Sequence, residues 1–334
     1  MTLSLRPGRD DDADAIIALI GACWSEYPGI VLDVDGELPE LRALATWTSA
    51  KGGAFWVAEA AGAIAGTAGV LPDGAGAWRI TRMYVAADQR GTGLADALLA
   101  QAESFARDAG ARRLTLFSDT RFARAHRFYE RHGYVRSGPL VALQDRSNTI
   151  EYGYAKPVEG VEALDAAAAA SAVRPLADIL VACVDSGAAV SFMPPLARTD
   201  ALAFWSRSAA AVARGERVIF AAWSDAEMAG TVTLDFAQQP NQPHRADIAK
   251  MMVRPCARRR GLARALMQAA EATAQARGRT LLTLDTREND AAEPLYRSLG
   301  FIEAGRIPGY ALNADGTLHA TVIMYKPLGN PEAA

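Results

Sequence analysis

Two copies of one short pattern constrain this 334-residue chain more than any other feature of its sequence. The segment Arg82–Ala95 (RMYVAADQRGTGLA) recurs as Lys250–Ala263 (KMMVRPCARRRGLA). In each copy an apolar run typical of a strand enters a short basic turn that contains glycine, and the turn opens a long amphipathic helix. The same strand–turn–helix unit is therefore present twice, which predicts two domains of similar fold.

The similarity between the copies continues beyond this helix. Each helix ends in glycine and is followed by a strand, and then by a second helix with a tyrosine four residues before a glycine-aromatic pair. The tyrosines are Tyr129 and Tyr296, and the pairs begin at Gly133 and Gly300. A self-match that extends over several elements indicates duplicated domains rather than one repeated motif.

The length of the chain agrees with this count, because 334 residues are many for one compact core. A strand-like run at 150–156 ends before Pro157, and a linker follows. We therefore place the domains at 1–157 and 158–334. The alanine-rich stretch at 163–172 fits either a strand edge followed by a helix start or a flexible joint.

Each domain is expected to be α/β, with a mixed sheet whose parallel part contains the turn. Three consecutive strands joined by tight turns precede a strand–helix–strand–helix–strand series in each half. The expected strands lie near 3–6, 54–60, 64–71, 78–85, 113–117, 150–156, 217–223, 228–236, 245–253 and 280–285. Further helices are expected near 11–24, 38–51, 175–187 and 199–214.

The two turns, Arg90–Ala95 and Arg258–Ala263, share the form Arg-x-x-Gly-x-Ala. Small residues let the backbone approach a ligand, and the unpaired N–H groups at a helix start favour an anion such as a pyrophosphate. The arginine adds charge-assisted hydrogen bonds. A dinucleotide-binding fingerprint would need glycine in place of Asp96, and neither copy contains the Gly-Lys-Ser/Thr of a Walker loop. A purely structural glycine turn is the remaining alternative.

Composition and charge argue against several classes of protein. Half of the residues are apolar and the net charge is −3, so there is no basic excess for nucleic acid. The N-terminus lacks a signal-peptide pattern and no apolar run is long enough to span a membrane, so we expect a cytoplasmic protein. Cys23, Cys183 and Cys256 have neither short spacings nor a histidine cluster, so neither a disulfide framework nor a metal site is expected.

Both copies resemble the GCN5-related N-acetyltransferase (GNAT) superfamily, whose Arg/Gln-x-x-Gly-x-Gly/Ala signature matches the two turns. The resemblance is strongest over 78–135 and 245–302. The second half is also similar to acetyltransferases of the tabtoxin-resistance type, through HRADIAKMMV, LLTLDT and IPGYALNADGTLH. The resemblance implies tandem domains, each with a mixed, centrally splayed sheet flanked by helices, and acetyl-CoA (coenzyme A) as the donor.

The resemblance also implies which residues hold acetyl-CoA: the turn takes the pyrophosphate, the preceding strand takes the pantetheine arm, and an asparagine of the later helix reaches the pantetheine. In the second half these residues are Met251, Met252, Val253, Arg258, Arg259, Arg260, Gly261, Leu262, Ala263 and Asn289. In the first half they are Met83, Tyr84, Val85, Arg90, Gly91, Thr92, Gly93, Leu94 and Ala95.

Tyr296 and Tyr129 are the candidate proton donors. A thiolate that leaves a thioester has a reference pKa of ~8.5 and a phenol ~10, so a tyrosine is able to protonate the departing sulfur. Asp285, at a strand end, is the first candidate for the base that deprotonates the amine, and Asp247 is the second; a cap or salt-bridge role is the alternative. Cys256 has no activating histidine beside it, so we expect direct transfer without an acetyl-enzyme.

The halves differ at the asparagine position, where Asn289 of the second half corresponds to Phe122 of the first. We therefore place the active site in the C-terminal half and expect the N-terminal half to bind acetyl-CoA with slow or no turnover. The expected acceptor is a primary amine of a small molecule. Closure of a loop at 307–310 and of the segment 192–195 over the site would favour that acceptor.

Two alternatives to this function remain open. The N-terminal domain, or in the extreme case both domains, would be a non-catalytic acetyl-CoA-binding scaffold or regulatory module. The acceptor would otherwise be a protein or peptide amine. The sequence also leaves the oligomeric state open, with a homodimer among the alternatives.

Overall fold

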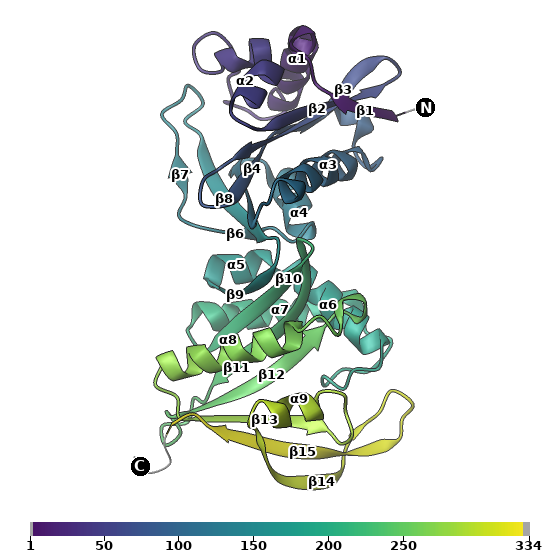
Figure 1. The fold of residues 1–334 in the computed structure, drawn as a ribbon, viewed down its shortest axis with the longest axis vertical. Coiled ribbons are helices and arrows are strands. Elements are labelled where there is room, and N and C mark those ends of the chain that lie inside the picture. The colour runs from purple at the N-terminus through teal and green to yellow at the C-terminus, as the bar shows by residue number, and fades with distance from the viewer. Residues whose placement is uncertain (1–2, 330–334) are drawn as a thin grey trace. The chain divides into compact units, whose positions relative to one another are not determined.

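The computed structural model describes residues 3–329 and contains two compact units. By their contacts, residues up to Tyr129 together with Arg136–Val158 form the N-terminal unit. Glu130–Val135 and the residues from Glu159 onward form the C-terminal unit. Each unit contains a mixed β-sheet with helices packed on it, which confirms the expected fold class (Figure 1). The domain division at 157 and 158 stays a prediction.

The sheet of the N-terminal unit has the order β1-β2-β3-β4-β5-β8-β6, with β7 paired to β8. Its strands are β1 (Leu3–Pro7), β2 (Ala54–Ala60), β3 (Ala63–Pro72), β4 (Ala77–Val85), β5 (Arg113–Asp119), β6 (Val135–Arg136), β7 (Val141–Ala142) and β8 (Ile150–Pro157). Its helices are α1 (Ala13–Trp24), α2 (Leu44–Ala50), α3 (Leu94–Asp108) and α4 (Ala123–Arg131); the last two residues of α4 and Val135 of β6 belong to the C-terminal unit by the division above. Ile16 of α1 and Leu44 of α2 belong to one apolar cluster with Phe55 and Val57 of β2.

The sheet of the C-terminal unit has the order β14-β15-β13-β12-β11-β10-β9. Its strands are β9 (Gly160–Leu164), β10 (Arg217–Ser224), β11 (Glu227–Phe236), β12 (Arg245–Val253), β13 (Leu281–Arg287), β14 (Ile302–Leu312) and β15 (Leu318–Pro327). Its helices are α5 (Ala166–Ser171), α6 (Val173–Asp185), α7 (Arg198–Ala213), α8 (Leu262–Ala276) and α9 (Glu293–Ser298).

Helices cover both faces of the C-terminal sheet. Strands β10 and β11 are buried along most of their length, as expected of strands with two covered faces. Alternate residues of β10 belong to two different apolar clusters. Phe220 shares a cluster with Leu266 of α8, and Ile219 shares the other with Leu180 of α6 and Trp205 of α7. The sheet is therefore a rigid central layer on which loops and strand ends are held in place.

The two parallel strands at the centre of this sheet part soon after they begin to pair. Strands β12 and β13 are in register from Arg245 and Leu281 only as far as Asp247 and Thr283. Beyond this point β12 continues to pair with β11, and β13 continues to pair with β15. The residues at the end of β12 therefore keep one strand neighbour and have an open edge on the other side. Strands β4 and β5 of the N-terminal unit part in the same way.

The structure corrects two expected elements of the second half. The segment Ile307–Tyr310, expected as a loop, lies within β14, which forms a long hairpin with β15. A register shift between Ile307 and Ala311 interrupts the regular pairing there, which explains the loop-like sequence. Asn289 precedes α9 rather than lying on it, and its φ of 59° is left-handed and incompatible with a helix.

The alanine-rich stretch after the first unit is ordered as a strand edge followed by a helix. Strand β9 ends at Leu164 and α5 begins at Ala166. The carboxylate of Asp165 accepts a hydrogen bond of 2.8 Å from the backbone N–H of Ala168, which caps the helix. The alternative of a flexible joint is therefore wrong.

Candidate functional site

A cavity of about 530 Å³ lies in the C-terminal unit where β12 and β13 part. Its volume is in the range typical of small-ligand sites. The end of β12 (Ile248–Val253), the end of β13 (Asp285–Arg287) and the loop after α6 (Ser186–Ser191) contribute to its wall. The turn before α8 and residues of and just before α9 complete it. One cavity thus collects residues from the second copy of the strand–turn–helix unit and from the elements that follow it.

The turn before α8 forms a cationic part of the wall. Gly261 occupies the N-cap position of this 15-residue helix with a φ of 82°, which favours glycine. The Nη2 of Arg258 donates to Oγ of Ser186 at 2.7 Å, and its Nε donates to the carbonyl of Val253 at 3.3 Å. No carboxylate of residues 3–329 pairs with Arg258, so its charge remains available. With the first N–H groups of the helix, this charge suits an anion.

Most of the residues predicted to hold the cofactor in the second half line this cavity. They are Met251, Met252, Val253, Arg258, Arg259, Gly261, Leu262 and Ala263. Arg260 and Asn289 are not part of the described wall. Arg260 forms an ion pair of 2.7 Å with Asp225, and the backbone N–H of Asn289 donates to Glu293 at 3.2 Å.

Tyr296 reaches the cavity from α9 and is largely buried. Its ring lies 6.0 Å from the ring of Phe301, centroid to centroid, which fixes its position. Among residues 3–329 nothing forms a hydrogen bond with the Tyr296 hydroxyl. Burial raises the pKa of Tyr296 above that of an exposed phenol, so the group remains protonated at neutral pH.

Asp285 lies on the wall at the point where β13 departs from β12, and it is exposed to solvent. The hydroxyl of Thr321 donates to its Oδ2 at 3.3 Å. Asp247, the other candidate base, is not part of the described wall. Its carboxylate pairs with Arg245 at 2.5 Å and accepts a hydrogen bond from the hydroxyl of Thr283, so it links β12 to β13, and its role as a base stays a prediction.

Lys250 is a residue of the cavity that the sequence analysis missed. Its ammonium lies 5.8 Å from the ring centroid of Phe192 and 5.7 Å from that of Phe204, and it donates to Oγ of Ser191 at 3.3 Å. Burial lowers the pKa of Lys250. The one signal in the sequence was its place in the repeat, where Lys250 corresponds to Arg82. The structure gives both residues a φ of 49°.

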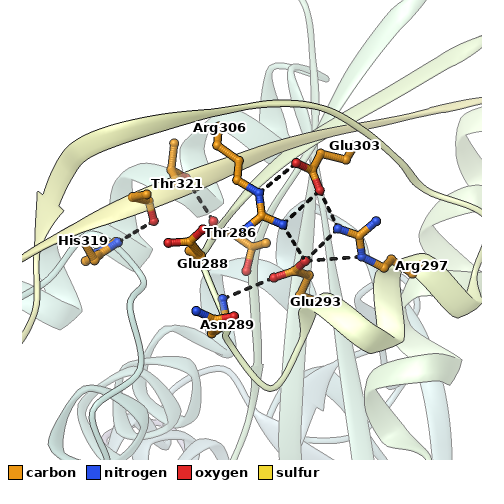
Figure 2. A network of polar contacts seen from close by, with 10 residues as sticks. Thr286, Glu288, Asn289, Glu293, Arg297, Glu303, Arg306, His319 and Thr321 are labelled. Carbon is orange, nitrogen blue, oxygen red and sulfur yellow. Dashed lines mark hydrogen bonds and ion pairs between the residues drawn. The ribbon is translucent and has the colours of Figure 1, made fainter.

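A network of ion pairs holds the segment between β13 and α9 against β14 (Figure 2). Arg297 pairs with Glu293 at 2.7 Å and with Glu303 at 2.5 Å. Arg306 pairs with Glu303 at 2.8 Å and also contacts Glu288. Because of Arg306 and Arg297, the pKa of Glu303 falls to about 2. The network ties the start of α9, and with it the helix that carries Tyr296, to a strand of the sheet.

The corresponding residues of the N-terminal unit occupy equivalent elements. Met83, Tyr84 and Val85 end β4, and Arg90–Ala95 form the turn and the start of α3. Gly93 has a φ of 89° at the N-cap of α3. Tyr129 is buried on α4, and burial raises its pKa. Their roles stay predictions.

Residues 3–329 contain no group of three or more His, Cys, Asp or Glu side chains placed to hold a metal ion. Within the same residues, no helix has the length and apolar character needed to cross a membrane.

The family model "Acetyltransferase (GNAT) family" matches the chain twice, at residues 16–134 and 190–301, which together exceed half of its length. Rat N-acetyltransferase 8 is 31% identical over 125 residues, or 36% of this chain. The chain spans about half of that relative, 54% of its length. The narrower resemblance to tabtoxin-resistance acetyltransferases stays a prediction.

Solved structures similar to this chain each correspond to about half of it. An N-acetyltransferase from Staphylococcus aureus Mu50 has 17% identity and a TM-score of 0.44, and covers 51% of this chain and 99% of its own. A ribosomal-protein-alanine N-acetyltransferase from Brucella melitensis has 18% identity and a TM-score of 0.43, covering 50% of this chain and 98% of its own. A Salmonella typhimurium protein solved with its cofactor acetyl-CoA has 18% identity and a TM-score of 0.44, covering 53% of this chain and 97% of its own.

Proposed function

The chain belongs to the acetyltransferase (GNAT) family, and from this premise we propose that it transfers an acetyl group from acetyl-CoA to a primary amine of a small molecule. We place the reaction in the cavity of the C-terminal unit. One observation carries the proposal: where the strands part, the turn with Arg258, a buried tyrosine and a strand-end aspartate line a single cavity.

The residues around the cavity fit acetyl-CoA, which supplies the acetyl thioester. The turn that contains Arg258 and Gly261 would hold the pyrophosphate, because its N–H groups favour an anion and so does its guanidinium, which pairs with no carboxylate of residues 3–329. The open edge of β12 at Met251–Val253 presents backbone groups that have no strand partner on that side, and these suit the amides of a pantetheine arm.

Two side chains would move the protons of the reaction. As the new N–C bond forms and the C–S bond breaks, the carboxylate of Asp285 accepts a proton from the amine nitrogen, and the Tyr296 hydroxyl donates one to the departing sulfur. The buried phenol is protonated and has no competing hydrogen bond among the described residues, which supports this role for Tyr296. Asp285 is exposed and releases its proton to solvent, and the Tyr296 phenolate takes up a proton from solvent as the products leave the cavity, so both groups return to their starting states.

The wall of the cavity supports a small acceptor. Ser186–Ser191 of the loop after α6 line the cavity beside the ends of β12 and β13, so this loop limits the room for a bulky chain. The segment Ile307–Tyr310 gives no such support, because it belongs to β14 and is not part of the described wall. A peptide amine is therefore the second candidate, and the assay must include one.

The function is tested by incubating the full chain with acetyl-CoA and a panel of small primary amines and short peptides, with mass spectrometry of the products. We expect acetylated small amines, and loss of product in the Tyr296→Phe variant. Acetylation of peptides alone would change the acceptor class. Tight binding of acetyl-CoA without transfer to any amine would support the non-catalytic alternative and refute the proposed reaction.

A further inference from the structure

Each unit contains the same pair of contacts where its helix α1 or α6 ends. Cys23 of α1 donates an Sγ hydrogen bond to the carbonyl of Val85, and Cys183 of α6 donates one to the carbonyl of Val253, both at 3.5 Å. The arginine of each turn donates its Nε to the same carbonyl, at 3.3 Å in both units. Positions 23 and 183 are therefore equivalent, and the residues that follow them correspond in order.

Three residues after these cysteines, the N-terminal unit has Glu26 where the C-terminal unit has Ser186. The Glu26 carboxylate forms a two-pronged ion pair with the guanidinium of Arg90, at 2.5 and 2.9 Å. Arg124 of α4 lies 3.6 Å from the same carboxylate. Arg90 lowers the pKa of Glu26, which keeps it charged at neutral pH. The arginine of this turn is thus already bound to an anion that belongs to the chain.

The next position differs as well. Tyr27 stands where the C-terminal unit has Gly187, a residue of its cavity wall. The ring of Tyr27 packs on the ring of Phe122, with centroids 4.6 Å apart. Phe122 itself occupies the position of Asn289. Two replaced positions therefore meet in the N-terminal unit, and each replacement exchanges a small or polar residue for an aromatic ring.

We infer that the N-terminal unit closes its own cofactor cleft. Glu26 takes the place of the phosphate at Arg90, and the Tyr27 ring of the Tyr27–Phe122 pair stands where the C-terminal unit has Gly187, a residue of its cavity wall. A pyrophosphate would have to displace a bidentate carboxylate and would be repelled by its charge. The chain then binds one acetyl-CoA, in the C-terminal unit. This replaces the expectation of a second acetyl-CoA at the N-terminal turn, and it rests on the proposed function.

Isothermal calorimetry of the full chain with acetyl-CoA tests the inference through its stoichiometry. We expect one site in the wild type, none after Gly261→Asp, and one after Gly93→Asp. The combined variant Glu26→Ser, Tyr27→Gly, Phe122→Asn carries the residues of the C-terminal unit, and it should gain a second site. The reverse graft, Ser186→Glu, should weaken the wild-type site at least tenfold, because it gives Arg258 the internal partner that Arg90 has.

The outcomes separate this inference from the proposed function. Two sites in the wild type, with one lost in Gly93→Asp, would overturn the inference and leave the function intact. Absence of any binding to the wild type would overturn the function. If the combined variant does not fold by circular dichroism, the two single glycine variants and Ser186→Glu still decide the question. Unchanged affinity in a folded Ser186→Glu variant would show that the residue at this position does not control access to the turn.

Discussion

Replacement of Tyr296 by phenylalanine isolates the proton-donating role of one oxygen atom. The ring remains packed on Phe301 at a centroid distance of 6.0 Å, and the lost hydroxyl has no hydrogen-bond partner among residues 3–329. The free energy of unfolding should therefore change by less than ~1 kcal/mol, because no hydrogen bond to a described residue is lost and the ring stays in place. General acid catalysis contributes ~10²–10⁴ in rate, and we expect kcat to fall by ~10²–10³. This equals ~2.7–4.1 kcal/mol of activation free energy.

The assay follows release of the free thiol by steady-state kinetics, with the affinity for acetyl-CoA measured separately by calorimetry. The matched control is Tyr310→Phe, which removes the same atom from a side chain that is 54% exposed on β14. Because burial raises the pKa of Tyr296, its ionisation should cause no loss of wild-type rate below pH ~10. A kcat that is unchanged in Tyr296→Phe while KM rises would mean that the hydroxyl only positions substrate.

Three further outcomes are expected. Arg258→Glu should weaken acetyl-CoA binding by one to two orders of magnitude, since charge-assisted hydrogen bonds contribute ~1.5–3 kcal/mol each, and unchanged calorimetric affinity would remove the turn from the site. In Asp285→Asn, kcat/KM should fall mainly below the pKa of the acceptor amine and recover at higher pH, where the amine is already deprotonated. A loss of kcat/KM at every pH would show that Asp285 is a structural anchor. Glu103→Gln should destabilise the N-terminal unit by ~3–5 kcal/mol in urea unfolding, because it breaks a buried ion pair of 2.8 Å with Lys156. The double variant Glu103→Leu, Lys156→Met should recover most of the lost free energy of unfolding. If the double variant is destabilised as much as Glu103→Gln, the broken ion pair is not the cause of the loss.

The main elements of the fold were predictable because they depend on local patterns. The segment near 245–253, for example, is β12, and the expected helix after the turn is α8, which ends at Ala276 just before Gly278. The exceptions are elements formed by distant contacts. Strands β6 and β7 have two residues each, too few for a periodic pattern. Strand β14 contains Pro308 and Gly309, which indicate a turn in sequence, but its pairing with β15 carries the chain through them.

The same distinction between local patterns and distant contacts applies to the site. The turn and Tyr296 were found because the repeat fixes their spacing, and the structure brings them to one cavity. Asp247 has the same residue type as Asp285, and only the structure shows that Asp247 is already bound to Arg245 and Thr283 whereas Asp285 lies on the cavity wall. Nothing in the sequence indicated the role of Glu26, because its partner, Arg90 of the turn, is distant in sequence. Residue type and spacing suggest chemistry, and tertiary contacts decide which groups remain available for it.

Beyond the point where β12 and β13 part, one edge of β12 has no neighbouring strand, although β12 lies near the centre of the sheet. Backbone amides of Ile248–Val253 that point away from β11 lack the strand that would protect them from exchange with solvent. A ligand lying along this edge would act as the absent strand, and its binding would be coupled to the unfolding of the C-terminal unit. At a concentration one hundred times its dissociation constant, such a ligand adds ~2.7 kcal/mol to stability. If that ligand is acetyl-CoA, its concentration would affect the stability of the C-terminal unit as well as the rate of the proposed reaction.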